Sequence, residues 1–108
     1  MKPNWFYILL SLSSGARYGT AIQDDVRTLS DGAVRLWPAT LYGSLEELVG
    51  KGWLEEVSDD ERPEVISGRE RFYRITPPGR AALKAEVERI EGLARVARQR
   101  LSLRTVTT

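Results

Sequence analysis

Cysteine and histidine are both absent from the 108 residues of this chain. Without cysteine there can be no disulfide, no thiolate nucleophile and no cysteine-based zinc site. Without histidine, the chain lacks the commonest general base and metal ligand of proteins. Its carboxylates form no paired constellation with a base or a metal cluster. These absences argue against an enzyme. We expect a cytoplasmic, non-catalytic protein that binds no metal and no cofactor.

Long apolar runs are missing as well. The stretch "WFYILL" at residues 5–10 is too short to cross a membrane, and no small-residue cleavage site follows it. We therefore expect neither a membrane span nor a signal peptide. The net charge is only +1, which does not by itself indicate nucleic-acid binding, although a local basic patch could still support it.

A chain of this length suits one domain with a single modest core. Apolar periodicity predicts helices over residues 3–13 and 20–30, and a third helix that starts near Pro38. A turn is expected at 14–19, and Gly52 is expected to end the third helix. The residues predicted to face the core are Trp5, Ile8, Leu9 and Leu12 in the first helix, Ala21, Ile22, Val26 and Leu29 in the second, and Leu41, Leu45, Leu48 and Val49 in the third.

The second half of the chain predicts a hairpin and one long helix. Strands are expected over 53–57 and 71–76. Thr76 can then cap a helix that runs to residue 101. This order describes a mainly α protein with a small β-hairpin, a winged helix-turn-helix followed by a long C-terminal helix. We expect residues 1–76 to form the DNA-binding domain and residues 77–108 to form the dimerisation helix and tail, all in one compact domain.

The third helix carries the candidate DNA-reading residues. Such a helix reads the major groove with its N-terminal residues, and hydroxyl groups can bond phosphates or base edges. The residues expected to face outward and contact DNA are Thr40, Tyr42, Gly43 and Ser44. The alternative is that Tyr42 packs on the hairpin and that Thr40 caps the helix locally.

Arginines flank the second predicted strand. Strand alternation places Arg71 and Tyr73 on one face, with Phe72 and Arg74 on the other. In a wing, Arg69 and Arg71 would neutralise DNA backbone phosphates. The alternative is that these arginines pair with Glu55, Glu56 or the acidic stretch at 59–64, in exposed ion pairs that contribute only about 0–1 kcal/mol each.

The long C-terminal helix has a heptad-like apolar seam. Its members are Leu83, Val87, Ile90, Ala94, Ala97 and Leu101. Because the helix is longer than a three-helix core of this size can cover, we expect the seam to form a homodimer. Trp5 and Phe6 could pack on the partner's long helix. With Ile90 they could instead line a pocket for a small-molecule effector, although plain interface packing is the commoner use of such residues.

Three stretches resemble the PadR family of bacterial transcriptional repressors. They are "YILLSLSSGARYGTAI", "PATLYGSLEELVGKGWLEE" and "RFYRITPPGRAALKAEVERI", in the family's order and spacing. The resemblance is to the subgroup with a single long C-terminal helix. It implies a dimeric repressor that binds palindromic operator DNA and is often released by a small, frequently aromatic molecule. It also implies that Tyr18 contacts a phosphate. The alternative is that Tyr18 packs as an aromatic residue at the edge of the core.

The sequence departs from the family pattern at several positions. Trp37 stands where a capping serine is common, and Thr20 stands where a tyrosine often occurs. Glu46 and Glu47 replace the basic residues that are usual late in the third helix. These acidic residues and the near-neutral net charge keep a second function open, that of a winged-helix module that binds only other proteins.

Overall fold

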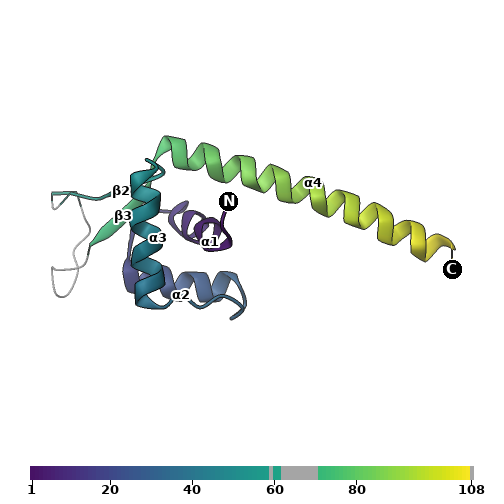
Figure 1. The fold of residues 1–108 in the computed structure, drawn as a ribbon, viewed down its shortest axis with the longest axis horizontal. Coiled ribbons are helices and arrows are strands. Elements are labelled where there is room, and N and C mark those ends of the chain that lie inside the picture. The colour runs from purple at the N-terminus through teal and green to yellow at the C-terminus, as the bar shows by residue number, and fades with distance from the viewer. Residues whose placement is uncertain (59, 62–70, 108) are drawn as a thin grey trace.

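The computed structural model describes residues 1–58, 60–61 and 71–107, with side chains up to residue 102. The elements are α1 (Pro3–Leu12), β1 (Arg17–Tyr18), α2 (Gly19–Leu29), α3 (Pro38–Gly50), β2 (Leu54–Glu56), β3 (Phe72–Ile75) and α4 (Pro77–Thr107). The first three helices gather at one end of the molecule beside the sheet, and α4 runs away from them (Figure 1). The predicted fold class, mainly helical with a small sheet in a winged helix-turn-helix, is confirmed.

The core lies where the apolar stripes of α1, α2 and α3 meet. Its helical members include Ile8, Leu9 and Leu12 of α1, Ile22 and Val26 of α2, and Leu41, Leu45 and Leu48 of α3, all at most 1% exposed. Two predicted core residues were wrong, since Leu29 is 44% exposed and Val49 is 40% exposed. Both lie at the C-terminal end of their helix, where less of the chain packs against it.

The ends of α3 and the start of α4 follow the predicted signals. Gly52 has φ of 79°, and the N–H groups of Gly52 and Trp53 donate to the carbonyls of Val49 and Leu48, each at 3.0 Å. This pair of bonds is the Schellman motif, which requires the left-handed conformation that glycine adopts at little cost. Thr76 caps α4, because its Oγ1 accepts from the Gly79 N–H at 3.1 Å.

The sheet contains a strand that the sequence did not predict. Its order is β1-β3-β2, with both pairs antiparallel. The expected turn at residues 14–19 includes β1, in which Tyr18 pairs with Phe72. Phe72 and Tyr73 of the central strand β3 are both buried, at 4% and 3% exposed, although they point to opposite faces. Tyr73 belongs to the core, and Phe72 packs against the Tyr18 ring.

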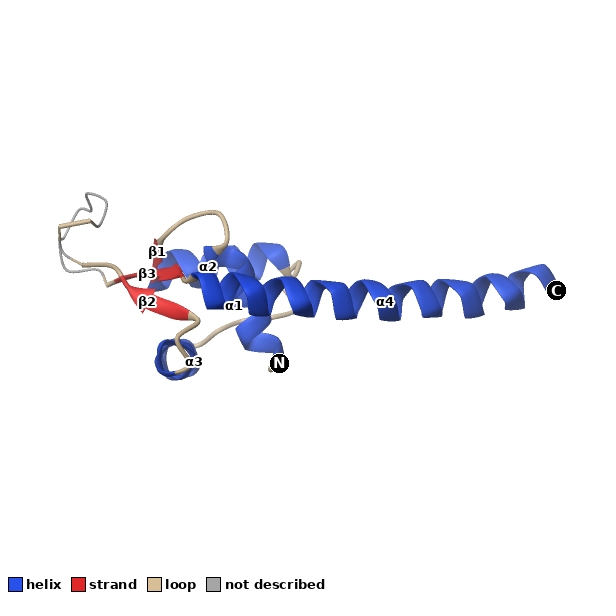
Figure 2. Ribbon diagram, turned by 90° about the horizontal axis from the view of Figure 1, so that it is seen from above, coloured by secondary structure: helices blue, strands red, loops and turns tan. Residues whose placement is uncertain are grey.

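Helix α4 gives the molecule its elongated shape. The principal extents are 61 × 27 × 22 Å and the radius of gyration is 16.9 Å, whereas a compact domain of this size would have a radius of about 13 Å. Figure 2 shows α4 passing beside α1 and then continuing far beyond it. The helix also extends past the predicted end at residue 101, to Thr107.

Candidate functional site

Helix α3 is fixed to the core along one side and open along the other. Leu41, Leu45 and Leu48 hold the inner side. On the outer side Ala39, Gly43 and Glu46 are exposed, and a Cβ added at Gly43 would meet no atom within 4 Å. The small side chains of Ala39 and Gly43 let another surface approach the helix backbone closely.

Three of the four DNA-contact residues predicted on α3 face outward, and one does not. Thr40, Tyr42 and Gly43 are exposed, but Ser44 is only 7% exposed. Ser44 follows Leu41 by three residues and precedes Leu48 by four, which places it on the same side of the helix as the core residues. Its expected outward orientation was therefore wrong.

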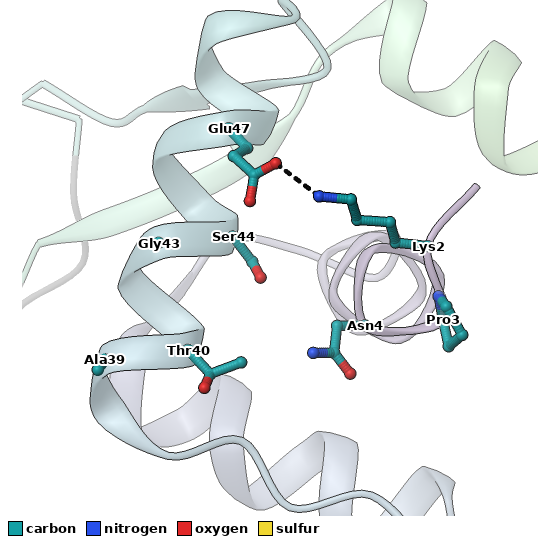
Figure 3. A pocket seen from close by; sticks show the side chains of 8 residues that line it. All are labelled: Lys2, Pro3, Asn4, Ala39, Thr40, Gly43, Ser44 and Glu47. Carbon is teal, nitrogen blue, oxygen red and sulfur yellow. Dashed lines mark hydrogen bonds and ion pairs between the residues drawn. The ribbon is translucent and has the colours of Figure 1, made fainter.

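Ser44 borders a hollow between α3 and the start of α1, and the exposed Thr40 lies at the same hollow (Figure 3). This hollow has a volume of about 480 Å³, and Asn4 borders it from α1. An ion pair closes one end, where Lys2 Nζ lies 3.0 Å from Glu47 Oε2. The negative charge of Glu47 is thus partly compensated by the residue that precedes α1.

Tyr42 reaches from α3 to the first turn of α2. A Cβ added at Gly19 would lie 2.5 Å from the Tyr42 hydroxyl oxygen, so the absence of a side chain at Gly19 makes room for this hydroxyl. Tyr42 is nevertheless 44% exposed. No side chain caps α2, and its first N–H groups carry the partial positive charge of a helix N-terminus. A hydroxyl donor and a positive helix end therefore lie at the same surface.

Tyr18, the N-cap residue of α2, has a half-buried ring. Its ring packs edge-on against Phe72, with centroids 5.3 Å apart. This contact is the core-edge packing that the sequence left open as an alternative. Since the Tyr18 side chain is only half-buried, phosphate contact by Tyr18 stays a prediction.

The arginines of the hairpin are paired with glutamates. Arg71 donates to both carboxylate oxygens of Glu56, at 2.8 and 3.1 Å, and this hydrogen bonding raises the Arg71 pKa above its ordinary value. Arg74 bonds to Glu55 at 2.6 Å and also to Glu61. Arg69 lies outside the described residues. The ion pairs considered as the alternative to phosphate contact are therefore present, although the Arg71 side chain stays 60% exposed.

The predicted dimerisation seam on α4 divides into a buried start and an exposed remainder. Leu83 is 8% exposed and packs into the chain's own core. Val87 and Ala94 are half-buried and Ala97 is exposed, while Ile90 is 40% and Leu101 60% exposed. Leu93 and Val96, at 59% and 43% exposed, widen this apolar stripe. The sequence prediction missed both, because it followed a strict four-three spacing.

The three residues of the predicted effector pocket lie in different surroundings. Trp5 is 9% exposed and packs edge-on against Trp53 at 5.9 Å. Phe6 is half-buried and touches Tyr7, whereas Ile90 is exposed on α4. None of the three lines the hollow between α3 and α1, or a second hollow between α2 and the residues before α3.

Metal sites and membrane-spanning helices are both absent from the part of the chain that the structure describes. No group of three or more acidic, cysteine or histidine residues there could hold a metal ion. None of the helices described is both long and apolar enough to cross a membrane.

Known proteins resemble this chain in both sequence and fold. Residues 8–85 match the model of the Transcriptional regulator PadR-like family. Transcriptional regulator Rv3488 of Mycobacterium tuberculosis is 44% identical over 68 residues, which are 62% of this chain and 59% of that protein. The match thus spans less than two thirds of that relative's length.

Solved structures extend the comparison to nearly the whole chain. A transcriptional regulator from Clostridium thermocellum has a TM-score of 0.71 at 26% identity, over 88% of this chain and 89% of its own. Bacillus subtilis PadR, solved in complex with operator DNA, has a TM-score of 0.65 at 17% identity, over 80% of this chain and 47% of its own. The latter likeness concerns the fold alone. Since the family model covers most of the residues, the chain belongs to the PadR-like family of transcriptional regulators.

Proposed function

We propose that this chain is a DNA-binding repressor that binds a palindromic operator as a homodimer. The proposal assigns DNA binding to residues 1–76 and dimerisation to residues 77–108. The observation that carries it is the arrangement of α3, which is held by its leucines and exposes Thr40, Tyr42 and Gly43. Membership of a family of transcriptional regulators and a fold shared with a PadR solved on its operator support the same conclusion.

Specificity in this proposal comes from two half-sites. Thr40, Tyr42 and Gly43 include no arginine, asparagine or glutamine, the residues whose paired bonds to a base each give about 1–3 kcal/mol of discrimination. One α3 should therefore discriminate only modestly between sequences. A dimer would place two such helices on half-sites about one helical turn, or a multiple of it, apart.

Removing the hydroxyl of Tyr42 should lower operator affinity and leave the fold intact. Tyr42→Phe deletes one donor at the α2 N-terminus, and Thr40→Ala deletes another exposed hydroxyl. Each should weaken binding by about 0.5–1.5 kcal/mol, the usual net value of a hydrogen bond. The measurement pairs melting temperature with affinity for an operator chosen by selection from random DNA. Tyr7→Phe is the control, since it deletes a hydroxyl from α1 instead.

A second variant tests the position of Tyr42 rather than its chemistry. Gly19→Ala would place a Cβ 2.5 Å from the Tyr42 hydroxyl oxygen, and the flexible end of that side chain can move away at little cost to the fold. The displaced hydroxyl should then bind DNA as poorly as in Tyr42→Phe, and the two changes together should not add. Normal melting combined with parental affinity in Tyr42→Phe, Thr40→Ala and Gly19→Ala would refute the assignment of α3.

Arg71 is expected to contribute general affinity for the DNA backbone. Arg71→Ala should weaken binding to operator and random DNA alike, and should lower the slope of log affinity against log salt by about 0.9, as the loss of one phosphate contact requires. Arg74→Ala is the matched control, because the Arg74 side chain is less exposed than that of Arg71, at 39% against 60%, and is held by two glutamates rather than one. An unaltered salt slope in Arg71→Ala would mean that Arg71 serves only the hairpin.

The second candidate function is a winged-helix module that binds another protein. The pairing of Arg71 with Glu56 and the exposed Glu46 on α3 favour it, because both reduce attraction to phosphates. The Tyr42, Thr40 and Arg71 variants discriminate between the two functions, since only a DNA-binding protein should show altered DNA affinity and salt dependence.

Release by a small aromatic effector completes the proposal. The dimer would bring the exposed Ile90 of one chain close to other apolar surface, and Trp5 and Phe6 lie on α1, which packs against α4. A pocket formed by these residues would therefore have to include the partner chain. Titration of the operator complex with aromatic compounds, monitored by loss of bound DNA, tests this part separately.

A further inference from the structure

Trp37 occupies a position where a tryptophan reduces helix stability. It is the N-cap residue of α3, and its side chain makes no capping hydrogen bond. Serine, threonine, aspartate and asparagine are preferred there because their oxygens accept from the first N–H groups of the helix. Trp37 is also 62% exposed, so the indole contributes little to the core. A residue that costs stability and stays in solvent indicates a role in binding.

Two arginines accompany Trp37 on the same surface. The Arg35 guanidinium lies 5.2 Å from the centre of the Trp37 ring. Arg27 of α2 joins them around a hollow of about 350 Å³. Neither arginine forms an ion pair with any residue whose side chain the structure describes, whereas Arg71, Arg74 and Arg89 each do.

The segment that carries Arg35 and Trp37 is held against α2. Gln23 donates from Nε2 to the carbonyl of Leu36 at 2.8 Å, and Leu36 itself is 3% exposed. The backbone between the two exposed side chains is therefore anchored. Asp24 lines the same hollow and opposes the two arginines, which leaves a net charge of one positive unit at this surface.

We propose that Arg35 and Trp37, with Arg27 beside them, form a second contact with the DNA backbone, just outside the half-site that α3 would read. The proposal rests on the proposed DNA-binding function and adds to it a specific surface. Guanidinium groups bind phosphate oxygens through paired, charge-assisted bonds. The indole of Trp37 orients Arg35 by a cation–π contact and offers its open edge to the sugar and phosphate.

Three substitutions test this surface. Arg35→Gln and Arg27→Gln should each lower affinity for operator and random DNA roughly threefold or more, and each should reduce the salt slope by about 0.9. Lys84→Gln, on α4, removes the same charge outside the hollow that Arg27 and Arg35 line, and it should leave affinity and slope near those of the parent. Measurements at four salt concentrations by fluorescence anisotropy give both quantities.

Trp37→Ser should raise the stability of the protein and lower its affinity for DNA, which a purely structural role of Trp37 would not predict. Serine can cap α3, so the melting temperature should rise, while affinity for DNA should fall. The salt slope should change little, because the indole carries no charge. Stability and binding thus move in opposite directions in one variant.

Fluorescence quenching supplies an independent readout. Among the three tryptophans, Trp37 is 62% exposed, whereas Trp5 is buried and Trp53 is half-buried. Acrylamide should quench part of the free protein's emission, DNA should protect that part, and the protection should vanish in Trp37→Phe.

The outcomes separate this inference from the proposed function. The inference is overturned if the parent binds selected DNA, the Arg35 and Trp37 variants bind it equally well, and Trp37 stays accessible to acrylamide in the complex. This surface would then serve another partner, such as a protein. If the parent binds no DNA sequence, both the inference and the proposed function are overturned.

Discussion

Replacing Leu93 and Leu101 with glutamate should convert the protein to a monomer. Its affinity for an operator with two half-sites should fall by about 100-fold or more, because two linked binding events become one. Both leucines are about 60% exposed in the single chain. Charged side chains at these positions therefore cost the monomer little, but would be buried without partners in a dimer interface. Light scattering measures the mass, and anisotropy measures the affinity.

The choice of these positions follows from the structure. A charged residue at Leu83, which is 8% exposed and packs in the chain's own core, would damage the fold and confuse the result. Arg95→Glu is the matched control, because Arg95 is exposed and helical periodicity places it on the side of α4 away from Leu93 and Leu101. It should stay dimeric. An unchanged dimer mass in the double leucine variant would show that this stripe is not the interface.

Gly79→Ala should destabilise the fold strongly. A Cβ at Gly79 would lie 2.1 Å from the Trp53 carbonyl oxygen and 2.9 Å from Ile75 Cγ1. The first turn of α4 would have to move away from the hairpin, and overpacking of this kind typically costs about 1–3 kcal/mol. For a domain of this size each kcal/mol lowers the melting temperature by about 4–8 °C, so a thermal melt should resolve the effect clearly.

Gly92→Ala provides the control within the same helix. A Cβ at Gly92 would meet no atom within 4 Å, and alanine is favoured over glycine in a helix interior by about 1 kcal/mol. The melting temperature should therefore rise in Gly92→Ala and fall in Gly79→Ala. Equal effects of the two substitutions would show that α4 does not dock on the hairpin as the structure describes.

Local sequence signals predicted the helices and their caps well. Proline at the start of α1, α3 and α4, glycine after α3 and threonine before α4 each act within a few residues, so their effects can be read from the chain directly. The core stripe of α1 was also predicted, as were Leu41, Leu45 and Leu48 of α3, because helical periodicity places these residues on one side of their helix. Ser44 was predicted to face outward because serine is polar. Its position in the helical repeat, three residues after Leu41 and four before Leu48, places it on the core side of α3 instead.

Features that depend on distant pairing could not be predicted in the same way. Strand β1 is two residues long and exists only because Arg17 and Tyr18 pair with β3, more than fifty residues later. The partner of Arg71 depends on the register between β2 and β3, so the sequence could offer Glu56 only as one alternative. The two arginines beside Trp37 were missed because nothing local in the sequence indicates which charges lack an ion-pair partner among the residues that the structure describes.

Selection of bound sequences from a pool of random double-stranded DNA tests the central claim most directly. The account predicts an enriched motif with two-fold symmetry, whose half-sites lie about one helical turn or a multiple of it apart, and predicts that Tyr42→Phe weakens its enrichment. The account of a dimeric, operator-binding regulator would be contradicted if no motif were enriched. It would also be contradicted by a single asymmetric site that the Leu93 and Leu101 double variant binds as tightly as the parent.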